Sequence, residues 1–105
     1  MTQEPLSEAM TSVDEATRAK LRKLHDHLAA TAERPVERTA SAHLGEAEAV
    51  AGDVADDPNV APAVVKSRIE TVSNLLSNVE KTGDDAADKH VERARELVAE
   101  LLSSE

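Results

Sequence analysis

The chain has 105 residues, enough for about one domain, and its 21 acidic and 12 basic side chains give a formal net charge of -9. It contains no cysteine, which excludes disulfides and thiolate metal sites, and no aromatic residue, which excludes aromatic stacking on bases or sugars. Aliphatic side chains must therefore form the whole core.

The composition also bears on location. No stretch reaches the roughly 18 consecutive apolar residues of a membrane span, and the N-terminus shows no basic region followed by an apolar run. We therefore expect a cytoplasmic protein that does not enter the membrane. Strong acidity suits a salty cytoplasm, since the Debye length falls to about 3 Å at 1 M salt and repulsion between carboxylates is screened. An acidic protein of an ordinary cytoplasm is the alternative.

The first helix is predicted over residues 13–33. Ser12 and Glu15 match a capping box, in which each side chain bonds the backbone N–H of the other residue. Three leucines then recur with helical spacing, at Leu21, Leu24 and Leu28. Residues 1–11 have no sustained periodicity, and we expect a mobile N-terminal arm there, ahead of a single domain over residues 12–105.

The second helix is predicted to begin near Thr39 or Ser41. Pro35 separates it from the first helix, because a proline disfavours helical geometry at the residue before it. The sequence DDPN, residues 56–59, ends it. Its apolar stripe lies on one face and consists of Ala40, Leu44, Ala47, Ala51 and Val54.

Two further helices follow. Pro62 suits the first turn of a helix over 62–81, where its missing N–H is no loss. Gly83 can take the left-handed conformation that closes this helix, and Asp84 or Asp85 can cap a fourth helix that reaches about residue 102. The two apolar stripes consist of Val65, Ile69, Val72, Leu76 and Val79, and of Ala87, Val91, Ala94, Val98 and Leu101.

Four amphipathic helices with short connections and no strand-like alternation predict an all-α fold, an antiparallel four-helix bundle. Prolines and Gly83 interrupt the pattern at intervals that suit separate helices rather than one extended coiled coil. The nearest alternative is a three-helix core to which the helix over 13–33 is loosely attached.

Two of the three glycines lie inside the second predicted helix. At about 100° per residue, Ala42, Gly45, Ala49 and Gly52 share the face opposite the apolar stripe. Glycine costs roughly 1 kcal/mol relative to alanine inside a helix, which suggests that something approaches this backbone closely. The approaching group is another helix of the bundle or a second subunit; alternatively, the face is simply exposed.

The four histidines do not predict a metal site. His25 and His27 lie about 200° apart on a helix and cannot chelate one ion together. His43 with Glu46, and His90 near two aspartates, form no recognised zinc or di-iron set, so we expect histidines at the core boundary, no metal and no cofactor. No nucleophile elbow or phosphate-binding glycine-rich loop is present either, and we expect no enzymatic activity.

Basic residues gather in the first predicted helix, whereas residues 39–64 contain no Lys or Arg. Arg18, Arg22 and Lys23 could contact nucleic-acid phosphates and release counterions. The alternative is an internal match between a basic first helix and an acidic second one. Phosphate contacts weaken steeply with salt, which counts against nucleic-acid binding in a salty cytoplasm.

The run over residues 21–54 and the run VERARELVAELL, residues 91–102, resemble sequences of a small uncharacterised family of acidic all-helical proteins of halophilic archaea. The most specific part is PVERTASAHLGEAEAVA, residues 35–51. The resemblance extends loosely over the whole chain. It implies adaptation to salt and no particular activity, cofactor or site.

The sequence therefore favours a non-enzymatic helical protein that acts by self-association, as a homodimer, or by binding a protein partner. The alternative is a nucleic-acid-associated regulator that uses the basic face of the first helix. The two functions differ in one observable: a regulator should shift a DNA or RNA band in a salt-dependent way, and a protein-interaction module should not.

Salt should stabilise the protein. With a net charge of -9, screening of carboxylate repulsion should raise the midpoint of thermal unfolding between about 0.1 M and 2 M KCl. Thermal melts followed by circular dichroism at the two concentrations measure this. An unchanged or lower midpoint at high salt would contradict the halophilic interpretation.

Overall fold

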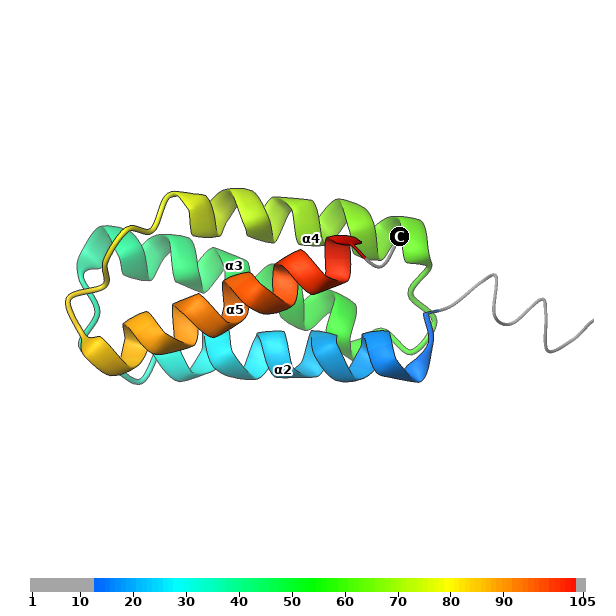
Figure 1. Cartoon of the computed structure of the whole chain (residues 1–105), viewed down its shortest axis with the longest axis horizontal. Helices are drawn as coiled ribbons and strands as arrows, with labels where there is room; N and C mark the ends of the chain where they lie inside the picture. Colours follow the sequence, from blue (N-terminus) through cyan, green and yellow to red (C-terminus); the bar gives the residue numbers. More distant parts are fainter. Residues whose placement is uncertain (1–12, 104–105) are drawn as a thin grey trace, which may run out of the picture.

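The computed structural model describes residues 13–103, which form four helices and no strand. The helices are α2 (Glu15–Thr31), α3 (Arg38–Asp56), α4 (Pro62–Ser77) and α5 (Asp85–Ser103). Consecutive helices run in opposite directions (Figure 1). None of these four is long and apolar enough to cross a bilayer. The predicted arm over residues 1–11 lies outside the described residues.

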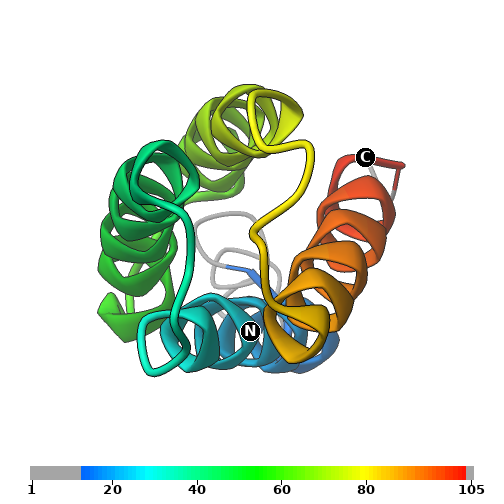
Figure 2. The same cartoon turned by 90° about the vertical axis from the view of Figure 1, so that its left-hand side faces the viewer.

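Each helix packs against two others, so that the four enclose one core. α2 contacts α3 and α5, and α4 contacts the same two helices from the opposite corner (Figure 2). The predicted antiparallel four-helix bundle is therefore confirmed. The alternative of a loosely attached first helix is wrong, because Leu21, Leu24 and Leu28 of α2 have no exposed surface.

The core consists of the predicted stripes. Each fully buried leucine or isoleucine contributes about 1.5–3 kcal/mol through the removal of its surface from water. The stripe of α3 contains three buried alanines, at positions 40, 47 and 51, and these short side chains let the neighbouring helices approach its axis. Val60 and Val79 extend the core into the connections, where both side chains are almost completely buried.

The first helix begins two residues later than predicted, because another residue caps it. Asp14, in an extended conformation, accepts a hydrogen bond from the backbone N–H of Thr17 at 2.8 Å. An N-terminal carboxylate also interacts favourably with the helix dipole. The predicted capping residue Ser12 lies outside the described residues. At the other end α2 stops at Thr31, whose buried hydroxyl donates to the carbonyl of Leu28 at 2.6 Å.

α4 ends at Ser77, whereas the apolar stripe predicts a helix to residue 81. At this end the backbone tightens, because the N–H groups of Asn78 and Val79 donate to carbonyls three residues back. Arg95 of α5 binds the same segment, since its Nη2 donates to the carbonyl of Leu76 at 2.8 Å and also to the carbonyl of Val79. Val79 keeps its predicted place in the core, but from the connection rather than from the helix. The apolar stripe in the sequence therefore extends past the end of the helix, because Val79 is buried although it is not helical.

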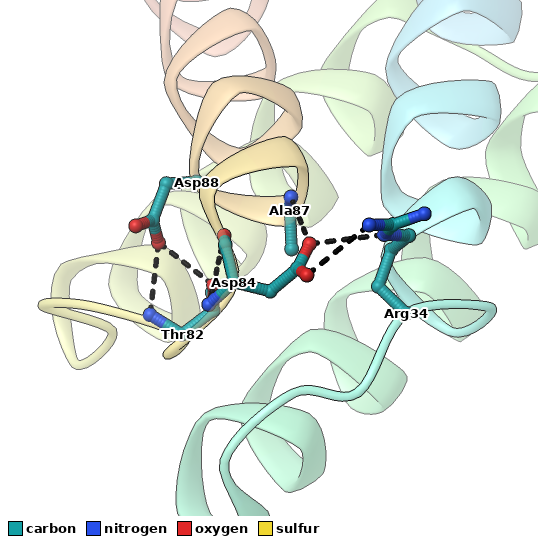
Figure 3. A network of polar contacts seen from close by, with 5 residues as sticks. All are labelled: Arg34, Thr82, Asp84, Ala87 and Asp88. Atoms are coloured by element: carbon teal, nitrogen blue, oxygen red, sulfur yellow. Dashed lines mark hydrogen bonds and ion pairs between the residues drawn. The ribbon is translucent and has the colours of Figure 1, made fainter.

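A buried threonine organises the connection between α4 and α5 (Figure 3). The backbone N–H of Thr82 donates to Oδ1 of Asp88 at 2.9 Å, and the threonine hydroxyl lies 2.8 Å from the same oxygen. Gly83 has a φ of 87°, the left-handed conformation predicted for it, although α4 has ended several residues earlier. Asp84, one of the two predicted capping residues, accepts from the N–H of Ala87 at 2.9 Å and caps α5.

The same connection is tied to the loop between α2 and α3. Arg34 binds Asp84 through two hydrogen bonds, with Nε at 3.0 Å from Oδ2 and Nη2 at 3.2 Å from Oδ1 (Figure 3). The backbone N–H of Glu37 also donates to the carbonyl of Thr82 at 2.7 Å. The hydrogen bonds from Arg34 and from the backbone of Ala87 hold the pKa of Asp84 below its ordinary value.

Replacing Asp84 with asparagine should weaken the acid sensitivity of folding. The pKa of Asp84 is lowered in the folded chain, so its carboxylate adds stability above the ordinary value of about 4, and this contribution is lost as the pH falls through the lowered pKa. Asp84→Asn should lower the unfolding midpoint at pH 7 and flatten its decline between about pH 5 and 2.

The control is Asp85→Asn, which changes the exposed carboxylate next in sequence and should keep the wild-type pH dependence. Thermal melts over this pH range compare the three proteins. Equal pH dependence in Asp84→Asn and wild type would show that the link to Arg34 contributes nothing to folding.

Candidate functional site

Three of the four residues predicted to form an interface on α3 are exposed. Ala42, Gly45 and Ala49 are exposed and form the outer face of α3, as we name it below. A Cβ atom built on Gly45 meets no atom within 4 Å. No contact within residues 13–103 therefore requires a glycine there, although glycine lowers helix stability by roughly 1 kcal/mol relative to alanine.

Gly52, the fourth predicted position, has a neighbour inside the bundle. A Cβ atom at this position would lie 3.2 Å from both Cδ2 and Nε2 of His25, which reaches over from α2. The same imidazole lies with Nε2 at 3.9 Å from a carboxylate oxygen of Glu48. Gly52 thus makes room for a histidine that spans α2 and α3, and the two glycines of this helix have different surroundings.

The three basic residues predicted to contact nucleic acid differ in the contacts that they make within the chain. Arg18 donates from Nη1 to the carbonyl of Asp57 at 3.1 Å and from Nη2 to that of Pro58 at 3.2 Å, just beyond the C-terminus of α3. Its positive charge thus faces the negative end of the α3 dipole. Arg22 lies 3.8 Å from a carboxylate oxygen of Glu15, with both side chains largely exposed. Lys23 is also exposed.

The predicted charge match between α2 and α3 takes a different form. Lys20 of α2 lies 3.6 Å from Glu100 of α5, so this ion pair joins the first helix to the fourth. Between α2 and the end of α3, Arg18 binds carbonyl groups rather than carboxylates. The partners of Arg18 are backbone carbonyl groups, which a search for oppositely charged residues in the sequence does not reveal.

Two histidines that are 63 residues apart in sequence meet between α2 and α5. Nδ1 of His27 lies 2.9 Å from Nδ1 of His90, and the ring centroids are 5.1 Å apart. Such a hydrogen bond needs one protonated and one unprotonated Nδ1. Burial, followed by the charges of His90 and Arg93, lowers the pKa of His27. Sequence spacing gave no signal for this pair, because it arises from the packing of two helices.

The fourth histidine makes a hydrogen bond within its own helix. His43 lies half-buried on α3, with Nδ1 at 3.0 Å from the carbonyl of Thr39 one turn earlier. The predicted partner Glu46 is exposed. Across residues 13–103 no group of three or more His, Asp or Glu side chains is arranged to hold a metal ion.

An open groove of about 370 Å³ lies between α4 and α5. Leu76, Val98 and Leu102 supply apolar walls, and Arg95 also lines it. Sequence analysis missed this groove because residues of two helices form it. The small side chains that border it, among them Ser73 and Ala99, were the available signal, since they leave space where larger residues would close the gap.

Residues 20–105 match the model of a protein family described as a domain of unknown function, DUF8152. The match includes the outer face of α3 and the histidine pair. No curated protein and no solved structure matches the chain.

The different surroundings of the two α3 glycines predict different effects of alanine. Gly45→Ala should stabilise the folded chain by up to about 1 kcal/mol, because alanine has the better helix propensity and the new methyl group meets nothing. Gly52→Ala should stabilise less, since its methyl group must displace the ring of His25.

A double-mutant cycle isolates the second effect. In a His25→Ala background the ring is absent, and Gly52→Ala should stabilise as much as Gly45→Ala does. Urea unfolding of the single and double variants gives the four free energies. If Gly52→Ala has the same effect with and without His25, the imidazole does not constrain this position.

Proposed function

The chain belongs to this family of domains of unknown function, and we propose that it acts without catalysis, by associating with a second copy or a protein partner through the outer face of α3. The observation that carries the proposal is the exposed Gly45, a residue that weakens the helix and has no neighbour within 4 Å of its built Cβ. Ala42 and Ala49 flank it one turn on either side. A stripe of small residues lets the backbone of another helix approach closely.

We propose a homodimer as the first form of this association. α3 carries several exposed acidic side chains, including Glu46 and Asp53, and no Lys or Arg after Arg38. Two copies that meet through such surfaces repel one another at low ionic strength. Salt screens this repulsion and should therefore favour the dimer.

We also propose that the protein acts in the salty cytoplasm of a halophilic archaeon. The net charge of -9 and the resemblance of residues 35–51 to halophilic sequences support it. A surface adapted to high salt fits an interaction that forms only when charges are screened.

The alternative of a nucleic-acid-associated regulator has less support. Arg18 already binds backbone carbonyls, which leaves Arg22 and Lys23 as the exposed charges of the predicted set. Two phosphate contacts supply little affinity, and that affinity falls with salt. An electrophoretic shift of DNA that Arg22→Gln and Lys23→Gln abolish would favour this alternative.

Light scattering coupled to size-exclusion chromatography tests the association at about 0.1 M and 2 M KCl. We expect a dimer whose fraction rises with salt. Gly45→Leu should be monomeric with unchanged helical content, because a bulky side chain then blocks the approach of a second helix. The matched control is Ala63→Leu, which places the same side chain on the exposed surface of α4 and should leave the dimer intact.

A wild-type chain that stays monomeric at high salt would contradict self-association. The partner form of the proposal is then tested with wild-type, Gly45→Leu and Ala63→Leu baits in a high-salt extract of the source cells. A protein retained by the first and third baits and lost by the second would support it. Equal retention by all three would exclude the outer face of α3.

A further inference from the structure

The histidine pair between α2 and α5 is not used by the proposed function. Nδ1 of His27 and Nδ1 of His90 lie 2.9 Å apart in a direct hydrogen bond, with the ring centroids 5.1 Å apart. Both side chains are half-buried, and each is followed in the sequence by a buried core residue, Leu28 or Val91. The pair therefore lies at the edge of the core, where α2 meets α5.

The number of protons on the two rings decides whether this bond can form. A neutral imidazole carries its proton on Nδ1 or on Nε2, whereas an imidazolium carries a proton on both nitrogens. Two neutral rings can bond, because one donates from Nδ1 and the other accepts there. One neutral ring and one imidazolium can also bond, and the charged donor strengthens the bond. Two imidazolium rings cannot bond, since both Nδ1 atoms are then donors.

We propose that His27 and His90 form an acid-sensitive link between α2 and α5. The pair joins the two helices while at most one ring is an imidazolium, and the link opens when the second ring binds its proton. Two N–H groups then meet across a gap that holds one hydrogen atom, and the rings must turn apart to find water or another acceptor. α2 and α5 lose this polar contact at the edge of the core.

The charged groups around the pair oppose the second proton on balance. Lys23 on α2 and Arg93 on α5 place positive charge near His27, and Asp26 supplies an opposing negative charge. Arg93 also forms an ion pair with Glu96, with Nη1 at 2.7 Å from the carboxylate oxygen Oε1. The second proton thus enters a place that is short of both negative charge and hydrogen-bond acceptors.

Acid should therefore weaken the folded chain in a defined pH range. Burial, followed by the charge of His90, lowers the pKa of His27 below its ordinary value of 6.5. The unfolded chain takes up this proton more readily, so stability is lost as the pH falls from about 6.5 through the lowered pKa. High salt leaves this loss in place, because screening reduces repulsion between charges but does not turn a donor into an acceptor.

A double-mutant cycle at two pH values tests the link. Urea unfolding compares wild type, His27→Ala, His90→Ala and the double variant in about 2 M KCl, where repulsion between carboxylates is screened. At about pH 7.5 we expect a favourable coupling worth about two- to tenfold in the folding equilibrium constant, the contribution of one hydrogen bond. At about pH 5 this coupling should be lost or reversed.

His25→Ala and His43→Ala give the control cycle, since His43 bonds within its own helix, and its coupling should not change with pH. Coupling between His27 and His90 that is absent at about pH 7.5, or equal at both pH values, would overturn the proposal. The same pH dependence in the control cycle would also overturn it.

NMR titration of the imidazole groups gives a second measurement, which the wild-type chain alone supports. The His27 ring should titrate below 6.5, and its pKa should rise in His90→Ala, because the charge of the neighbouring ring is removed. His43→Ala should leave the titration of His27 unchanged. A wild-type His27 that titrates at or above 6.5 would overturn the proposal.

Discussion

The close packing of short aliphatic stripes is the constraint on which the rest of this structure depends. Without Phe, Tyr or Trp, the chain has no large apolar side chain to fill a wide gap between helices. The helices must therefore approach one another, and the buried alanines of α3 and α5 make this possible, among them Ala47, Ala51 and Ala94. The leucines of α2 complete the fourth side of the core, so that removal of this helix would expose the apolar faces of both α3 and α5.

The ends of the helices are stabilised by polar groups that the core cannot supply. Arg95 binds the carbonyl of Leu76 near the end of α4 and that of Val79 in the connection, and Arg18 binds carbonyls beyond the end of α3. Arg34 and Asp84 join two loops at one end of the bundle. Several arginines thus act within the chain, on backbone carbonyls and on a carboxylate near the ends of the helices. The surface that remains is correspondingly more acidic, which links the internal architecture to the expected preference for salt.

The sequence predicted what depends on local periodicity. The stripes of all four helices, the capping role of Asp84 and the left-handed Gly83 are visible in the spacing of residue types. What the spacing could not reveal depends on the packing of separate helices. The end of α4 at Ser77, for example, lies where an arginine of another helix binds the backbone.

The surroundings of the candidate sites also depend on how separate helices pack, and the sequence spacing could not reveal them. Gly45 and Gly52 share one helix face, and only the position of α2 distinguishes the exposed glycine from the one that His25 covers. The contact between His27 and His90 likewise required the three-dimensional arrangement. The central claim is therefore that α2 is an integral part of one cooperative core. Native-state hydrogen exchange tests this claim most directly. The account predicts that the amides of Leu24 and Leu28 in α2 exchange with the same opening free energy as those of Ile69 and Val98 in the other helices. Exchange of the α2 amides through a separate opening of lower free energy would contradict it.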